Sequence, residues 1–295
     1  MKVVGLGGGH GLAATLRAAR LYADEVAAVV TVADDGGSSG RLTREYGIPP
    51  PGDIRNCLVA LADPSRLADI YQHRFDEGPF IGHTVGNIVI AALSEMTGDF
   101  AAAVATAGDL IAAKGRVFPA TTELVRLGAR IEGGEIDGQV AVAQTHSPIE
   151  AVYLTPADPP AHQGAVAAIG SADQIVMGPG SLFTSLLAAL LVPGIADALR
   201  STSARRVFVC NSRMQKGETE TLDATAHVTA LVGHVGADSV DVVVVQSPEL
   251  PTDGVRLDRS SMGMLDIEIV EADVARPDGS HDPRRLAEVL GRLRK

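Results

Sequence analysis

A glycine-rich tract closes the first apolar segment of this chain and opens its first helical one. Val3–Leu6 is a short apolar run, GLGGGHG follows at Gly5–Gly11, a helical pattern covers Leu12–Tyr22, and a second apolar run covers Val26–Val32. A strand, a turn, a helix and a strand open a parallel sheet, because parallel strands need a crossover connection. The fold class predicted is α/β: a doubly wound, mainly parallel Rossmann-like sheet in a three-layer α/β/α structure.

Strands and helices alternate again in the second half of the chain. The predicted strands are Ala151–Leu154, Gln174–Met177, Arg206–Cys210, Val240–Val245 and Leu265–Val270. The predicted helices are Ala161–Ile169, Leu182–Leu191, Thr221–Val232 and Pro283–Arg294. No linker or internal repeat interrupts the pattern, so residues 1–295 are expected to form one domain.

The region from about residue 53 to 146 departs from this alternation and is predicted to be a helical and β-hairpin insertion. Asp63 is the expected N-cap of one helix, because Pro64 follows it. The hairpin is expected to pair Glu123–Ile131 with Gln139–Gln144 across the turn-rich EGGEIDG. The helices expected in this region are Asp53–Leu61, Pro64–Gln72, Val85–Met96 and Phe100–Ala113.

The first glycine tract is a candidate phosphate cradle. Glycines allow positive φ and let backbone amides approach an anion at a helix N-terminus. The strict G-x-G-x-x-G fingerprint fails, because its third glycine would fall on His10 or Leu12, so NAD binding does not follow. The alternative is a tight turn with close helix–strand packing. The candidate binding residues are Gly7, Gly8, Gly9, His10 and Gly11.

The tract TVADDGGSSGR at Thr31–Arg41 follows the second strand. In a Rossmann-like sheet, a carboxylate from Asp34 or Asp35 at this edge accepts ribose hydroxyls; alternatively, the pair holds Mg²⁺. Neighbouring side chains diverge on an extended backbone, so only one carboxylate is expected to point inward, and Asp34 is preferred. The alternative is that Asp34 and Asp35 belong to a solvent-exposed acidic turn that binds nothing. The expected donors to the ligand are Gly37, Ser38, Ser39 and Arg41.

Four further tracts lie at predicted helix starts or strand ends. In PPPGDIRN, Asp53 and Asn56 are candidate contacts, although Asp53 is also a good N-cap. GHTVGN places Asn87 just inside a helix that Thr84 is expected to cap, and a lone His83 is more often structural. The remaining candidates follow strands at the same edge of the sheet: Gly178, Gly180 and Ser181 of GPGS, and Asn211. No nucleophile–base set is evident, so catalytic residues are not predicted.

Composition limits the classes of partner. The formal net charge is −11 and aromatic residues make up 3% of the chain, which argues against a nucleic-acid or anionic-membrane partner. Cys57 and Cys210 have no metal-ligand spacing and are expected to be buried, reduced thiols. The apolar stretch Leu182–Leu199 is broken by Pro193, so no membrane span is expected. A cytoplasmic protein is predicted.

Seven tracts in a fixed order resemble the YvcK family, the bacterial gluconeogenesis-factor group within the CofD-like superfamily. They are GGGHG, TVADDGGSSGRL, PPPGDIRNCLVAL, QHRF, GHTVGN, GPGSLFTSLLAALLVPGI and CN, and the likeness runs from Lys2 to about Val245. The resemblance implies a doubly wound sheet and a regulatory protein that binds UDP-N-acetylglucosamine. It also implies a role linking gluconeogenesis and central carbon metabolism to cell-wall synthesis and cell shape. No cofactor is certain in this interpretation.

The chain departs from the family pattern at two places, and two other functions stay open. Lys216 stands where a proline is usual, and Ser280 stands where other members often carry arginine before His-Asp. Asp282 before Pro283 is accounted for as a helix N-cap. The enzymatic relatives imply an alternative, a Mg²⁺-dependent 2-phospholactate transferase with metal on Asp34 or Asp35. A further alternative is an NAD-binding oxidoreductase. A homo-oligomer and a regulatory protein partner are both compatible with the sequence.

Overall fold

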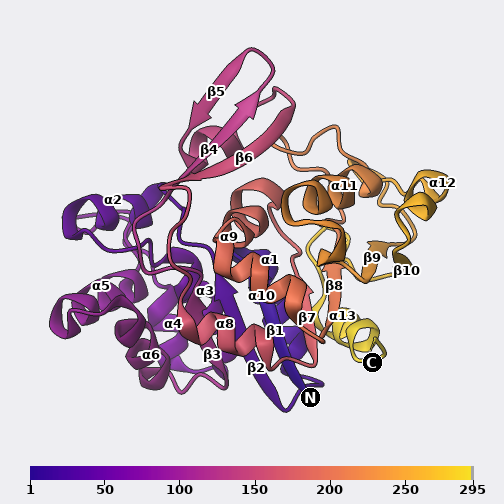
Figure 1. Cartoon of the computed structure of the whole chain (residues 1–295). Coiled ribbons are helices and arrows are strands. Elements are labelled where there is room, and N and C mark those ends of the chain that lie inside the picture. Colours follow the sequence, from indigo (N-terminus) through magenta and orange to yellow (C-terminus); the bar gives the residue numbers. More distant parts are fainter. Residues whose placement is uncertain (294–295) are drawn as a thin grey trace.

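Seven strands form the central sheet, in the order β10-β9-β8-β7-β1-β2-β3 (Figure 1). The structure is a computed structural model and describes residues 1–293. All six neighbouring pairs are parallel, which confirms the predicted fold class. The sequence pattern does not predict β3, because four residues are too few to show the alternation of apolar and polar side chains that identifies a strand. The strands are β1 (Lys2–Gly7), β2 (Glu25–Val30), β3 (Arg116–Pro119), β7 (Gln174–Met177), β8 (Arg205–Val209), β9 (Val242–Gln246) and β10 (Glu268–Ala272).

Helices cover both faces of this sheet and give the expected three layers. Successive strand residues point to opposite faces, so Val176 joins one hydrophobic core while Ile175 and Met177 join the other. The first core lies under α1 (Gly9–Ala19), α3 (Gly52–Leu61) and α13 (Pro283–Leu290). The second lies under α8 (Gln163–Gly170), η1 (Leu182–Leu187), α9 (Ala188–Leu190), α10 (Pro193–Ser201) and α11 (Ala224–Val235). The predicted end of the last helix at Arg294 lies outside the described residues.

The remaining helices stand at the edges of the layers. They are α2 (Gly37–Tyr46), α4 (Arg66–Gln72), α5 (Val85–Thr97), α6 (Phe100–Leu110), η2 (Ala237–Ser239), α12 (Arg259–Met262) and η3 (Gly263–Leu265). The prediction of Asp63 as an N-cap is wrong: the hydroxyl of Ser65 caps α4, accepting from the amide of Ala68 at 3.2 Å. Asp63 pairs instead with Arg20 and Lys114, so its carboxylate is held by two cations.

A second, three-stranded antiparallel sheet projects from the main body beyond α2 (Figure 1). Its order is β5-β4-β6, with β4 at Arg126–Ile131, β5 at Gly134–Asp137 and β6 at Ile149–Thr155. The predicted hairpin therefore has the wrong second strand. Gln139–Ala143 is a short helix, α7, and the strand predicted at residues 151–154 belongs to this small sheet.

The apolar run at residues 182–201 is bent. The helical segments Leu182–Leu190 and Pro193–Ser201 meet at an angle of 79°. No single helix among residues 1–293 is long and apolar enough to cross a membrane. The two bent segments taken together do reach the length and apolar composition of a membrane span. The break predicted at Pro193 is confirmed, since Pro193 stands in the first turn of α10. Cys57 and Cys210 are both free and buried, as predicted.

Candidate ligand-binding site

The strand order reverses between β1 and β7. From β1 the chain proceeds through β2 to β3 on one side, and β7 returns to the other side of β1. Ligands of open α/β sheets bind at such a switch point, outside the carboxyl ends of the strands. The first glycine tract follows β1 and GPGS follows β7, so both predicted loops meet at this point.

The first glycine tract leaves the N-terminus of α1 without a side-chain cap. Gly7 and Gly9 adopt positive φ angles of 139° and 63°, whereas Gly8 is extended. The amide of Gly9 donates to the carboxylate of Asp53, and His10 and Gly11 of the first turn line a cavity. First-turn amides have no partner within their own helix, so this end of α1 suits an anion.

Gly11 also has a packing role. A Cβ atom at this position would lie 2.2 Å from the carbonyl oxygen of Pro179. The start of α1 and the GPGS loop therefore touch backbone to backbone, and a side chain would force them apart. The packing explanation considered for these glycines holds for Gly11.

Two carboxylates, those of Asp34 and Asp53, lie close enough to influence each other beside this tract. Asp34 accepts from the amide of Gly36 at 3.0 Å and from the hydroxyl of Ser39, which in turn accepts from the amide of Gly52 at 3.2 Å. Burial, together with the negative charge of Asp34, raises the pKa of Asp53 to about 6. Burial also raises the pKa of Asp34. Both residues are half-buried, and a pair of like charges in such a place favours a proton or a cation between them.

The structure corrects the local role expected of Asp53 and separates Asp34 from Asp35. Pro51 is the N-cap of α3, so Asp53 stands within the first turn and is not the cap. The carboxylate of Asp35 turns away from Asp34 and accepts from the amides of Gln139 and Val140 at 3.1 and 3.0 Å. Asp35 thus fastens the start of α7, and a role of its carboxylate in ligand or metal binding stays a prediction.

Valine at Gly8 is expected to damage this pair of carboxylates directly. A Cβ atom there would lie 2.3 Å from Oδ2 of Asp53 and 3.0 Å from Cγ2 of Thr31. Gly8→Val should lower the free energy of unfolding by about 1–3 kcal/mol, the usual cost of overpacking, and weaken ligand binding. Chemical denaturation and ligand titration measure the two effects.

Gly233→Ala in α11 is the matched control for that change. A Cβ atom at Gly233 meets nothing within 4 Å, so alanine should be neutral or stabilising by helix propensity. If Gly8→Val unfolds and binds like the wild type, Gly8 does not pack against Asp53 in solution.

The GPGS loop is already hydrogen-bonded within the protein. The amide of Gly180 donates to Oδ1 of Asn211 at 2.9 Å, and Gln215 donates to the hydroxyl of Ser181 at 3.1 Å. Glu218 accepts from the amide of Thr184 at 3.2 Å, at the start of η1. This loop therefore shapes a wall of the cavity, and a direct phosphate contact from Gly178, Gly180 or Ser181 stays a prediction.

Ser38, Asn56 and Asn87 belong to a buried polar network on the far side of α2. Asn87 donates to the hydroxyl of Ser38 at 3.0 Å, and that hydroxyl lies 2.9 Å from Nδ1 of His83. Arg55 joins the network by donating to Asn87 at 3.1 Å and Asn56 at 2.7 Å, and also to Thr84. Gly37, at the uncapped start of α2, is exposed. The network fastens α2 to α3 and α5.

Arg41 does not face the cavity. Its Nη2 donates to the carbonyl oxygen of Ile81 at 2.7 Å, which ties α2 to the neighbouring loop. The expected phosphate contact from Arg41 therefore requires the side chain to leave this position.

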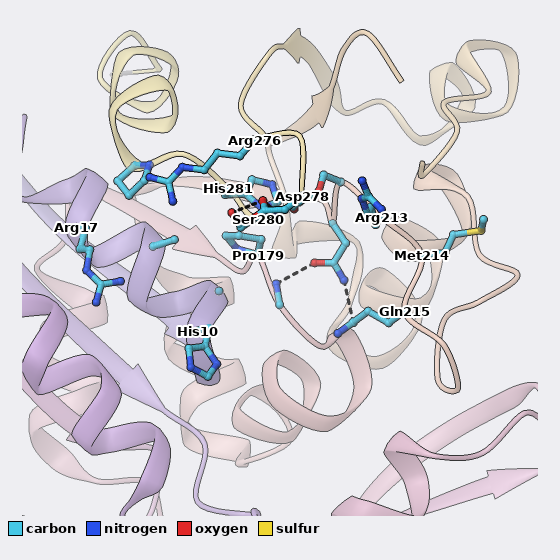
Figure 2. Close-up of a pocket in the computed structure, with 17 residues that line it drawn as sticks. His10, Arg17, Pro179, Arg213, Met214, Gln215, Arg276, Asp278, Ser280 and His281 are labelled. Atoms are coloured by element: carbon cyan, nitrogen blue, oxygen red, sulfur yellow. Dashed lines mark hydrogen bonds between the residues drawn. The ribbon is translucent and has the colours of Figure 1, made fainter. Parts of the chain in front are cut away.

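A cavity of about 670 Å³ opens between α1, the loop after β8 and the segment before α13 (Figure 2). His10 and Arg17 face it from α1, while Arg213, Arg276 and His281 face it from the opposite wall. Among the described residues, Arg17 and Arg213 have no carboxylate within 4.0 Å. Nη2 of Arg213 donates to the carbonyl oxygen of Pro277 at 2.7 Å, so a phosphate would have to use the other nitrogens of this guanidinium or displace that contact. Burial lowers the pKa of Arg17, and Arg20 and Arg276 nearby lower it too. An anion in this cavity would relieve the repulsion.

Sequence reasoning missed these arginines. Arg17 lies seven residues after His10 on the same face of α1, which is a weak signal that the glycine tract could have directed attention to. Arg213 and Arg276 come from segments far apart in the chain, and their side chains meet the cavity only in the folded protein.

Comparison with known proteins gives concordant results. The family model described as 2-phospho-L-lactate transferase CofD matches residues 3–278. The chain is 46% identical over 303 residues to a Mycobacterium tuberculosis protein provisionally named a gluconeogenesis factor, covering 98% of this chain and 89% of that one. It is 37% identical over 311 residues to the gluconeogenesis factor of Bacillus subtilis, covering 100% and 98%. A crystal structure of a UPF0052 family member from Bacillus halodurans superposes with a TM-score of 0.94 at 36% identity, covering 98% of each chain.

Proposed function

The chain belongs to the CofD family, and from this premise we propose that it is a regulatory protein that binds a nucleotide sugar, UDP-N-acetylglucosamine. The names of its relatives support a role in gluconeogenesis. The further link to cell-wall synthesis and cell shape rests on the family resemblance of the seven sequence tracts.

One observation carries the proposal: two arginines without carboxylate partners and an uncapped helix N-terminus face one cavity at the switch point. The chain has a net charge of −11, so arginines that face a cavity without an ion pair among residues 1–293 are a local exception. Guanidinium groups and first-turn amides are both suited to phosphate oxygens. A diphosphate between the start of α1 and Arg17 would use both kinds of donor.

The nucleoside is proposed to extend toward β2. Asp34 stands beyond the second strand, the position at which a carboxylate accepts ribose hydroxyls in related sheets. The cavity of about 670 Å³ falls within the range of small-molecule sites.

A thermal-shift panel tests this function. At a ligand concentration about 100 times Kd, binding stabilises the folded state by about 2.7 kcal/mol, which should raise Tm by roughly 5 °C for a chain of this size. UDP-N-acetylglucosamine should give this shift, whereas NAD and GDP should not. An unchanged Tm with UDP-N-acetylglucosamine, or an equal shift with NAD, would contradict the proposal.

A Mg²⁺-dependent transferase is the second candidate, and the electrostatic interaction between the carboxylates of Asp34 and Asp53 favours it. Residues 1–293 contain no group of three histidine, cysteine or acidic side chains that could hold a metal. Mg²⁺ needs only one or two carboxylates together with water and phosphate oxygens, so Asp34, Asp53 and the hydroxyl of Ser39 fit it. When bound, the ion would neutralise charge on a phosphate. Turnover of the nucleotide that requires Mg²⁺ and stops in EDTA would favour this candidate over the regulatory one.

A further inference from the structure

His281 is held in one orientation on the wall of the cavity. The imidazole is 9% exposed and stands in a turn closed by the backbone bridge between Ala275 and His281. One ring nitrogen donates to the backbone carbonyl of Cys210. The other, Nε2, is buried and has no hydrogen-bond partner among the described residues. Nδ1 is therefore the donor to Cys210.

The neutral form of this ring makes Nε2 an acceptor. Burial lowers the pKa of His281 to about 4, so the ring is uncharged at neutral pH. With the proton on Nδ1, the lone pair of Nε2 remains free. An acceptor buried without a partner costs free energy, and such atoms in native structures call for an explanation.

Several other acceptors along the cavity already accept hydrogen bonds from the protein. Oδ1 of Asn211 accepts from Gly180, and Oε1 of Gln215 accepts from Asn211 at 3.0 Å. The carboxylate of Asp278 accepts from the hydroxyl of Ser280 at 2.7 Å. The arginines contribute only donors. The cavity thus combines several donors for an anion with an uncommitted acceptor at His281.

We infer that His281 is a specificity-determining residue whose Nε2 accepts a hydrogen bond from an N–H or O–H group of the bound nucleotide or nucleotide sugar. A ligand that fits the cavity then carries two kinds of group: phosphate oxygens for the arginines and a hydrogen-bond donor on its base or sugar. Pyrophosphate carries only the first. This inference rests on the function proposed above and deepens it.

His281→Asn and His281→Gln separate the two nitrogens of the ring. Asparagine can keep the bond to the carbonyl of Cys210 but has no acceptor at the position of Nε2, whereas glutamine reaches that position with an amide oxygen. We expect His281→Asn to weaken UDP-N-acetylglucosamine binding by about five- to a hundredfold, the range for an unpaired buried donor. His281→Gln should recover part of the loss. Isothermal titration measures each affinity.

Pyrophosphate and a second histidine supply the controls. His281→Asn should leave the affinity for pyrophosphate unchanged, because that ligand has no donor for Nε2. His227 has the same local arrangement, with Nδ1 2.7 Å from the carbonyl oxygen of Asp223 and Nε2 unpartnered, but it does not line the cavity. His227→Asn therefore controls for loss of a buried imidazole and should bind every ligand like the wild type.

Each outcome separates this inference from the function on which it rests. Wild-type affinity of His281→Asn for UDP-N-acetylglucosamine overturns the role of His281 and leaves the proposed function standing. Equal losses for pyrophosphate and the nucleotide sugar also overturn it, since the effect is then structural. If the wild type prefers GDP or another nucleotide, the proposed function fails and the same comparison is made with that nucleotide. A wild type that binds no nucleotide overturns both.

Discussion

Replacing Arg17 and Arg213 together by alanine is expected to reduce the affinity for UDP-N-acetylglucosamine by about a hundredfold or more. A hydrogen bond to a charged group contributes about 1.5–3 kcal/mol, so two such contacts correspond to roughly 10²- to 10⁴-fold if they act independently. Neither arginine has a carboxylate within 4.0 Å among the described residues, so no intramolecular ion pair is lost with it. The measurement is isothermal titration at low salt, with circular dichroism to verify folding.

Arg44→Ala is the matched control for the double variant. Arg44 is exposed on α2 and does not line the cavity, so its removal changes the net charge without touching the site. The affinity should stay within about twofold of wild type, because an exposed distant charge is largely screened. If the double variant also binds within threefold of wild type, the cavity between α1 and α13 is not the phosphate site.

Asparagine at position 53 is expected to stabilise the empty protein at pH 8. Burial and the charge of Asp34 raise the pKa of Asp53 from 3.8 to about 6, so ionisation at pH 8 opposes folding. The stabilisation linked to this proton is fully present below pH 3.8 and is lost as the pH rises through 6. Asp53→Asn keeps the uncharged shape and should raise the free energy of unfolding at pH 8 by about 2 kcal/mol. Urea denaturation should show a gain at pH 5 that is about half of the gain at pH 8, because pH 5 lies between the unfolded and folded pKa values of this carboxyl.

Asp35→Asn should have the opposite sign, which makes it an informative control. The carboxylate of Asp35 accepts from two amides at the start of α7, so its loss should destabilise the protein by about 1 kcal/mol, as for other helix caps. If Mg²⁺ binds between Asp34 and Asp53, it should stabilise the wild type and not Asp53→Asn. If Asp53→Asn is less stable than the wild type at pH 8, the ionised carboxylate of Asp53 does not destabilise the folded protein.

The opening β1–α1–β2 unit could be predicted because its determinants are local. Glycines determine the turn after β1, and short runs of apolar residues determine β1 and β2. The sequence QVAVAQ at residues 139–144 alternates like a strand but begins a helix. Gly138, with φ 104°, ends β5 there, and Asp35 caps the helix from more than one hundred residues away. No local pattern contains that contact.

In the candidate site, too, the residues with local signals could be predicted and those brought together by the fold could not. Asp34 could be selected from the sequence because it lies in the loop that follows β2, and the divergence of Asp35 follows from backbone geometry. The neighbour of Asp34 turned out to be Asp53, whose position at a helix start suggested a cap. Arg17, Arg213, Arg276 and His281 gather from three separate segments, and only the strand order of the sheet brings those segments together.

The position of β1 between β7 and β2 has a consequence for how the chain folds. Its two neighbours are β2, which follows closely, and β7, which begins only at Gln174. Until that part of the chain has been synthesised, one edge of β1 lacks its partner, and bare edges invite wrong pairings. Pairing over such a sequence separation is slow, because loop closure costs entropy before the contacts form. The cavity, whose walls come from both sides of this junction, therefore exists only after the last segment has docked, and ligand binding reports a completed fold.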